Sequence, residues 1–226
     1  MSISSVLLLD DSSPLVDPSR YTQTVGALHY VTLSRPDIAF AVNKVSQFMH
    51  APIENHWAEV KRILRYLKGT LSLGLWIRHT SGYRLQAFTD SHWSTNLQAF
   101  SDSDWAGCPI DRRSMGGFAI YIGTNLISWS ARKQKAVSRS STESKYKAIA
   151  DTIAELIWIK SLLRELGLNS EAQHYGVIIL GKLNVKFIST DDQIVDIFTK
   201  PLSSKKFEFL RSKLQIATRP EVVREY

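Results

Sequence analysis

The chain has 226 residues, of which 44% are apolar and 22% are charged, and its formal net charge is +7. This composition is typical of a soluble globular protein with one well-packed core or two smaller ones. The positive charge favours an anionic partner, nucleic acid before membrane, because no strongly amphipathic basic helix with an aromatic anchor stands out. A basic surface that serves only solubility is the alternative.

A single cysteine, Cys108, excludes an internal disulfide and a multi-cysteine zinc site. The six histidines are scattered without close pairs, so we expect them in packing or at the surface. The apolar run at residues 6–9 lacks a basic leader, and no apolar stretch has the length of a membrane span. We therefore expect an intracellular protein, cytoplasmic or nuclear, without a membrane partner.

The first part of the chain is predicted to be helical. Residues 1–20 are rich in Ser, Asp and Pro without a sustained period, which predicts a loose leader. Pro36 suits the first turn of a helix that continues to Met49 with apolar residues at helical spacing. A second helix follows Pro52 and ends at Gly69. Its apolar stripe comprises Trp57, Val60, Ile63, Leu64 and Leu67.

The other side of this second helix is basic, with Glu59 as its single acid. Its cations are Lys61, Arg62, Arg65 and Lys68. Such a cluster is a candidate contact to a phosphate backbone, and a solvated helix surface is the alternative. A second basic run is given the same candidate role and comprises Arg132, Lys133, Lys135 and Arg139.

From Leu73 the hydrophobic period changes toward two, which predicts a β meander. The strand-like runs lie at residues 73–77, 85–89, 97–101, 117–122 and 126–130. The stretch LQAFTDSHW at 85–93 is repeated as LQAFSDSDW at 97–105, so one pattern of strand and carboxylate occurs twice. A long helix is predicted from Ser140, three residues before Glu143 in a capping-box pattern, to Gly167. The remaining predictions are strands at 177–180 and 185–188 and short helices from Gln193 and from Ser203.

Long stretches of the chain carry a family resemblance. They are YTQTVGALHYVTLSRPDIAFAVNKVSQFM at 21–49, HWAEVKRILRYLKGT at 56–70, FSDSDWAGC at 100–108, DRRSMGGF at 111–118, LISWSARKQKAVSRSSTES at 126–144 and VKFISTDDQIVDIFTKPLS at 185–203. Together they resemble the end of the Pol polyprotein of copia-type retrotransposons, where the reverse-transcriptase tail meets a ribonuclease H domain. The resemblance implies an α/β protein with a loose leader (1–20), a helical reverse-transcriptase tail of thumb or connection type (21–72), a degenerate ribonuclease H-like mixed sheet with flanking helices (73–216) and a tail (217–226).

Enzymes of this family cut the RNA strand of RNA:DNA hybrids with two divalent cations, Mg²⁺ or Mn²⁺, held by four carboxylates. The four acids come from a first strand, the long helix after it, a fourth strand and a late helix. The resemblance assigns the first acid to Asp102 and the last to Asp196. Asp90 belongs to the extra copy of the repeated stretch, which we interpret as an insertion, and Asp104 is expected to support a turn or a ligand.

The other two acids of the family are missing. Where the family has S-T-E-A-E-Y, this chain has STESKY at 141–146, so Lys145 replaces the helix glutamate. Glu143 faces another side of the helix, and we expect Lys145 to repel Mg²⁺. One hypothesis is that Lys145 instead pairs with Asp102 and takes the charge-balancing place of a metal. The fourth strand falls in a deletion between Gly167 and Val185. Its loss would expose backbone groups of the first strand, a vacancy that the duplicated run at 85–89 can fill.

The leading interpretation is a Pol fragment with an inactive ribonuclease H-like domain that binds no catalytic metal. One alternative is a weakly active metal-dependent ribonuclease H; another is a remnant that binds RNA:DNA hybrids through the two basic clusters. A third is an open reading frame whose product does not fold. The family's polymerase motif Y-x-D-D is absent, which excludes reverse transcription by this chain alone. Other Pol-derived chains are further candidate partners.

Overall fold

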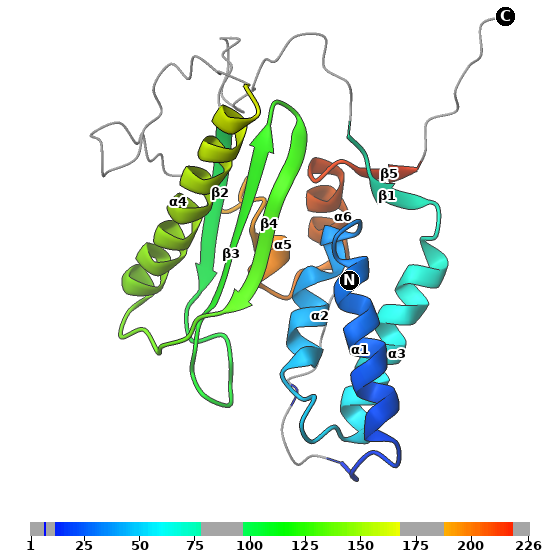
Figure 1. Cartoon of the computed structure of the whole chain (residues 1–226). Helices are drawn as coiled ribbons and strands as arrows, with labels where there is room; N and C mark the ends of the chain where they lie inside the picture. Colours follow the sequence, from blue (N-terminus) through cyan, green and yellow to red (C-terminus); the bar gives the residue numbers. More distant parts are fainter. Residues whose placement is uncertain (1–6, 8–11, 78–96, 168–187, 219–226) are drawn as a thin grey trace, which may run out of the picture. The chain divides into compact units, whose positions relative to one another are not determined.

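The computed structural model describes residue 7 and residues 12–77, 97–167 and 188–218. The chain divides into two compact units (Figure 1). The helical unit comprises Met1–Trp76 and Pro201–Tyr226, and the sheet unit comprises Ile77–Lys200. The α/β class expected from the sequence is confirmed. Residues 201–216, which the sequence analysis grouped with the ribonuclease H-like domain, lie in the helical unit.

The helical unit begins earlier than the sequence pattern predicts. Helix α1 (Pro18–Val31) has Asp17 as its N-cap, whose carboxylate accepts a hydrogen bond of 2.9 Å from the backbone N–H of Arg20. Before this helix, the backbone N–H of Leu15 donates to the carbonyl of Pro52 at 3.0 Å. Part of the predicted loose leader is therefore structured.

The predicted helices after Pro36 and Pro52 are confirmed. They are the 3-10 turn η1 (Pro36–Ile38) with α2 (Ala39–Ser46), and α3 (Glu54–Gly69). The three α-helices share an apolar core, to which each contributes buried side chains: Tyr21, Val25, Leu28, Val42, Val45, Val60 and Ile63. Full burial of a large apolar side chain contributes about 1.5–3 kcal/mol to stability. Leu64, which the pattern placed in the apolar stripe, is 39% exposed.

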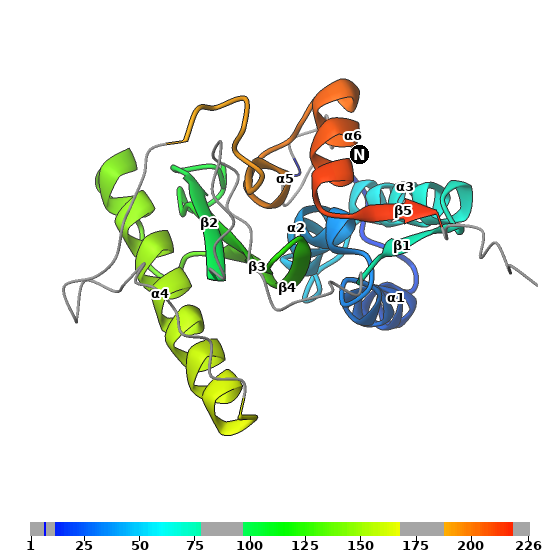
Figure 2. The ribbon, with the colours of Figure 1, turned by 90° about the horizontal axis from the view of Figure 1, so that it is seen from above.

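The helical unit is completed by residues from the far end of the chain. Strand β1 (Leu73–Leu75) pairs antiparallel with β5 (Ile216–Thr218), which follows helix α6 (Ser204–Lys213). Figure 2 shows β1 and β5 side by side. The predicted strand at 73–77 is thus confirmed as β1, but it does not join the meander. The predicted helix from Ser203 is α6, with Ser203 as its N-cap.

The sheet unit contains a three-stranded antiparallel meander in the order β2 (Leu97–Asp104), β3 (Met115–Ile122) and β4 (Asn125–Lys133). Gly123 turns the chain between β3 and β4 with a φ of 63°, a conformation that glycine adopts without strain. Within the described residues, β2 is paired only on its β3 side. The predicted runs at 85–89 and 177–180, and all but the last residue of 185–188, lie outside the described residues.

Two helices cover opposite faces of this sheet (Figure 2). Gly116 of β3 faces α4 (Ser141–Glu165), where a Cβ would lie 3.8 Å from the Cβ of Ala148. The next residue, Gly117, faces α5 (Asp196–Thr199), because successive residues of a strand point to opposite faces. None of the helices in the described part of the chain is long and apolar enough to cross a membrane.

Helix α4 has the predicted start and end. The hydroxyl of Ser140 accepts a hydrogen bond of 3.1 Å from the backbone N–H of Glu143, and the Glu143 carboxylate accepts one of 2.8 Å from the backbone N–H of Arg139. The first bond satisfies a donor that the first turn leaves without a helical partner, and the second fixes the residue before the N-cap. Gly167 follows the helix with a φ of 71°, as expected for a glycine stop.

Candidate functional site

The first candidate acid, Asp102, lies on the face of β2 that is turned toward α5. Phe100, Asp102 and Asp104 share this face, whereas Ser103 points to the α4 side. Asp102 is only 7% exposed. A carboxylate buried to this degree requires hydrogen bonds or a counter-charge, since its water shell has been removed.

Helix α5 supplies these partners. The hydroxyl of Thr199 donates a hydrogen bond of 3.2 Å to Asp102 Oδ2. Gly117 stands opposite Asp102 on the neighbouring strand. A Cβ there would lie 3.1 Å from atoms of both Phe198 and Thr199, so the absence of a side chain allows α5 to approach the sheet.

The second candidate acid, Asp196, is brought to the same place. Asp196 is 1% exposed at the start of α5. The ammonium group of Lys200 lies 2.8 Å from Asp196 Oδ1 and 3.0 Å from Asp102 Oδ2. One lysine therefore bridges the two acids that the sequence assigned to the site. Their catalytic role stays a prediction.

The two neighbouring acids stabilise the charged form of Lys200. Burial by itself lowers the pKa of Lys200, but hydrogen bonds with Asp196 and Asp102 and their negative charges outweigh burial and raise the pKa above its ordinary value. Lys200 therefore remains protonated at neutral pH, and a fixed positive charge offsets the two buried carboxylates.

Asp104 lies at the end of β2, within electrostatic reach of the same group. Burial raises its pKa; the positive charge of Lys200 opposes this shift, and the negative charges of Asp102 and Asp196 add to it. Its backbone carbonyl accepts a hydrogen bond from the N–H of Gly107 in the following turn. This position agrees with the turn role expected for Asp104.

Lys145 does not pair with Asp102, so that hypothesis was wrong. Lys145 is exposed on the first turns of α4, and no ion pair joins it to Asp102. The reason is geometric. Its buried neighbour Ser144 packs toward the sheet, where its carbonyl accepts a hydrogen bond of 2.8 Å from Gln134, and Gln134 also donates to Ser103. Helix α4 thus covers the face opposite to Asp102.

Sequence reasoning missed Lys200, the cation that does meet Asp102. A signal was present, because Lys200 follows Asp196 by four residues in the stretch QIVDIFTK, the spacing at which side chains of a helical turn meet. The spacing predicts contact with Asp196. Contact with Asp102 depends on how α5 packs on the sheet.

The described residues do not fit a two-metal centre. Two fixed cations need several carboxylates to offset their mutual repulsion. Among the described residues, no three His, Cys, Asp or Glu side chains are grouped as a metal site requires. The two acids that do meet, Asp102 and Asp196, are already bonded to Lys200.

The basic cluster on α3 is divided by the structure into two sides. Lys61, Arg65 and Lys68 are exposed, whereas Arg62 is half-buried and lies 3.7 Å from Glu59. Ala58, Lys61, Leu64 and Arg65 line a shallow depression on the exposed side. Trp57 lies beside it, with the Arg20 guanidinium 5.3 Å and the Lys61 ammonium 6.0 Å from its ring centre. Arg20 is an additional cation that the sequence did not single out.

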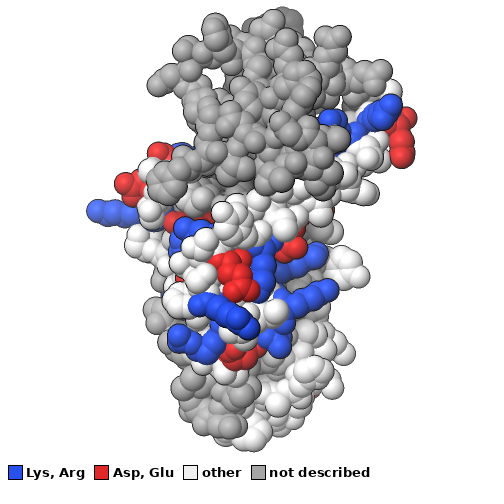
Figure 3. Space-filling model, turned by 90° about the vertical axis from the view of Figure 1, so that its left-hand side faces the viewer, with Lys and Arg blue, Asp and Glu red and all other residues white. Residues whose placement is uncertain are grey.

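The second basic run is divided in the same way, into one paired cation and three exposed ones. Lys133 forms an ion pair of 2.9 Å with Asp111. Arg132, Lys135 and Arg139 are exposed. On the face shown in Figure 3, Lys and Arg side chains lie beside Asp and Glu side chains rather than forming a continuous basic surface.

Comparisons with known proteins identify relatives of this chain. It is 37% identical over 252 aligned positions to the retrovirus-related Pol polyprotein from transposon RE1 of Arabidopsis thaliana, covering 97% of this chain and 16% of that protein. It is 32% identical to the retrovirus-related Pol polyprotein from transposon TNT 1-94 of Nicotiana tabacum, covering 84% of this chain and 16% of that protein. It is 51% identical to the uncharacterized mitochondrial protein AtMg00810 of Arabidopsis thaliana, covering 63% of this chain and 54% of that protein.

The chain and the Pol polyproteins differ in length in two ways. The chain spans only 16% of the length of each Pol polyprotein. The match to the RE1 polyprotein extends over 252 positions although this chain has 226 residues, so the relative has positions that this chain lacks. No family model and no solved structure matches the chain.

Proposed function

The chain belongs to the Pol polyproteins of copia-type retrotransposons, and we propose that its sheet unit is a ribonuclease H-like domain without nuclease activity. The order of elements supports this proposal. An antiparallel meander is followed by a long helix, and the two remaining acids lie on the first strand of the meander and on a late helix. This is the order that the family resemblance implies.

The position of Lys200 is the observation that carries the proposed inactivity. Its ammonium group lies within 3.0 Å of both remaining acids, so a divalent cation would have to displace a bonded positive charge. The family's helix acid is replaced by the exposed Lys145. Metal ions in this chemistry stabilise the attacking and leaving oxygens of the phosphodiester, and this stabilisation requires the carboxylates that hold them. The domain is expected to lack that stabilisation.

A cleavage assay tests the proposal directly. The purified chain is incubated with a labelled RNA:DNA hybrid and Mg²⁺ or Mn²⁺, beside an Asp102→Asn variant. We expect no cleavage above background with either protein. Metal-dependent cleavage that disappears in Asp102→Asn would refute the inactive assignment and support the weakly active alternative. Cleavage that persists unchanged in the variant identifies a contaminating nuclease, which further purification removes before the comparison is repeated.

A second candidate function, binding of nucleic acid, is supported by the exposed side of α3. Lys61, Arg65 and Lys68 recur along one side of the helix, and the nearby acid Glu59 is buried. Arg20 adds a further positive charge beside Trp57. Cations presented in this way can neutralise successive phosphates and release their counterions, which gives affinity without sequence preference.

Salt dependence distinguishes this function from a merely soluble surface. The affinity of the chain for an RNA:DNA hybrid should fall steeply as salt rises, and Lys61→Glu with Arg65→Glu should reduce the slope by about 1 for each lost phosphate contact. Lys160→Glu with Arg164→Glu, at two exposed positions four residues apart on α4, is the matched control for reversal of two charges. A flat salt response, or equal loss with the control, would count against this function.

A further inference from the structure

The C-terminal segment, residues 201–218, returns to the helical unit after the chain has formed the sheet unit. Strand β5 pairs with β1, and Trp76 strengthens the junction: its backbone N–H donates to the carbonyl of Gln215 at 3.1 Å, and its indole N–H donates to the carbonyl of Ala217 at 2.8 Å. A two-stranded ribbon is marginally stable by itself. Additional contacts must therefore hold the C-terminal segment.

One side of α6 supplies apolar contacts. Phe207, Leu210 and Leu214 are buried, whereas Phe209 is exposed. The ring of Phe207 meets the ring of Tyr66 on α3 edge-on, with centroids 5.8 Å apart and an interplanar angle of 77°. This is a preferred geometry for aromatic pairs. The segment therefore docks through a defined face.

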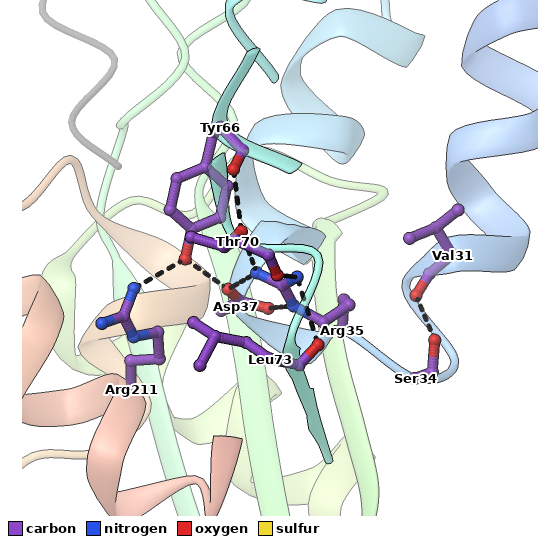
Figure 4. Close-up of polar contacts among 8 residues, drawn as sticks. All are labelled: Val31, Ser34, Arg35, Asp37, Tyr66, Thr70, Leu73 and Arg211. Carbon is purple, nitrogen blue, oxygen red and sulfur yellow. Dashed lines mark hydrogen bonds and ion pairs between the residues drawn. The ribbon is translucent and has the colours of Figure 1, made fainter. Parts of the chain in front are cut away.

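A buried polar network lies next to this contact (Figure 4). The Arg35 guanidinium binds Asp37 through two hydrogen bonds, of 3.0 Å to Oδ1 and 2.8 Å to Oδ2, and both side chains are almost fully buried. The hydroxyl of Tyr66 donates to Asp37 Oδ2 at 2.6 Å. Arg35 also donates to the carbonyl of Thr70 at 2.9 Å. The network joins the start of α2 to the end of α3.

Arg211 connects α6 to this network. Its guanidinium donates a hydrogen bond of 3.1 Å to the hydroxyl oxygen of Tyr66. The Tyr66 hydroxyl has one hydrogen, which it gives to Asp37, so its lone pairs remain for Arg211. Burial and the negative charge of Asp37 raise the pKa of Tyr66 to about 12, against the opposing effect of Arg211, so the hydroxyl keeps its hydrogen at neutral pH.

We propose that residues 201–218 act as a docked ligand of the helical unit, recognised by β1 and by Tyr66, whose hydroxyl is held by the buried Arg35–Asp37 pair, and that they stay bound when the chain is cut between α5 and α6. The segment that the helical unit recognises has three features: a helix with an apolar face, Arg211 one turn after Phe207, and the strand β5 after the helix. This inference is independent of the proposed nuclease inactivity.

A cut chain tests the proposal. A protease site is inserted after Pro201, which is exposed in the loop between α5 and α6, and the purified protein is cleaved and passed over a size-exclusion column. We expect the C-terminal fragment to elute with the rest of the chain. Arg211→Ala should raise the dissociation constant of the fragment about tenfold. Lys205→Ala, an exposed change on the same helix, should leave it unchanged, and release of the fragment from the otherwise unaltered protein would overturn the proposal.

Hydrogen exchange on the intact chain provides a second measurement that needs no insertion. In Arg211→Ala, amides in β1, β5 and α6 should exchange about tenfold faster, while those in β3 of the sheet unit keep their rates. Unchanged exchange in the first three elements would contradict the proposal even where the cut protein misfolds.

Discussion

The ammonium group of Lys200 lies 3.0 Å from Asp102 Oδ2, so a cation of the chain itself lies beside the carboxylate that the sequence predicts as a remnant of the family's metal site. The same ammonium group lies 2.8 Å from Asp196 Oδ1. A buried pair of this kind is costly to break, because removal of one partner leaves an uncompensated charge. Changes to this and to other contacts of the described residues should therefore alter the stability of the protein measurably.

Removal of the Lys200 charge should destabilise the protein, because Asp102 and Asp196 would remain buried without their counter-charge. In Lys200→Met, we expect the free energy of unfolding to fall by about 2 kcal/mol, below the usual range for a buried pair because Lys200 is partly exposed. Millimolar Mn²⁺ should restore part of the loss by replacing the missing cation. Urea unfolding measures both effects. Lys145→Met, at an exposed position, is the control, and equal effects of the two changes would contradict the role of Lys200.

Gly117→Ala should disturb the contact between α5 and the sheet. The added Cβ would lie 2.9 Å from the carbonyl oxygen of Ser130 and 3.1 Å from Phe198, which is too close without displacement. We expect a loss of about 1–3 kcal/mol in thermal or urea unfolding. Gly116→Ala adds the same methyl group on the other face, where the nearest atom is 3.4 Å away, and should cost less.

Asp111 should make stability depend on pH in the acid range. Burial by itself raises its pKa, but hydrogen bonds from Lys133, Cys108 and the Arg113 backbone lower the pKa to about 2. Because the folded pKa is below the unfolded value of about 3.9, the stabilisation is present above that value and is lost as pH falls toward 2. The stability difference between the unaltered chain and Asp111→Asn, measured by urea unfolding, should be about 1 kcal/mol near neutral pH and vanish at the acid end. Asp151→Asn controls for the loss of one surface charge.

Ser140→Ala should weaken the start of α4. The change removes the acceptor for the backbone N–H of Glu143, and we expect a loss of about 1 kcal/mol in the free energy of unfolding. Ser141→Ala, one residue further into the helix, is the matched control, and helix content is followed by far-UV circular dichroism. If the two variants are equally stable, Ser140 is not the effective cap.

Asp37→Asn should strongly destabilise the helical unit. The change leaves the Arg35 guanidinium buried with a neutral partner, and we expect a loss of about 3–5 kcal/mol. The double variant Arg35→Met with Asp37→Leu removes both charges and should lose less than Asp37→Asn alone. Chemical unfolding of both proteins checks the order, and the reverse order would contradict the assigned pairing.

The local elements of this protein follow from local signals. Ser140 with Glu143, Pro36 and Gly167 mark helix boundaries because capping and backbone restriction act within a few residues. The alternation of apolar and polar residues in 97–101 is also a local signal, and it predicts a strand. By contrast, the order of residues 12–15 could not be predicted, because it depends on tertiary pairing with the start of α3. The start of α1 was missed although Asp17 and Pro18 are a local signal of a helix start.

Some features of the candidate site could likewise be predicted from the sequence, and others depended on tertiary structure. Sequence by itself determined the family, and it predicts Asp102 and Asp196 as the two remaining acids and Lys145 as the replacement of the helix glutamate. Only the tertiary structure decided that Lys200, rather than Lys145, meets Asp102, and that β1 pairs with β5. The physical reason is distance along the chain. Burial among residues far apart in sequence decides which face of a sheet a helix covers and which strand another strand pairs with, and no local pattern encodes such contacts.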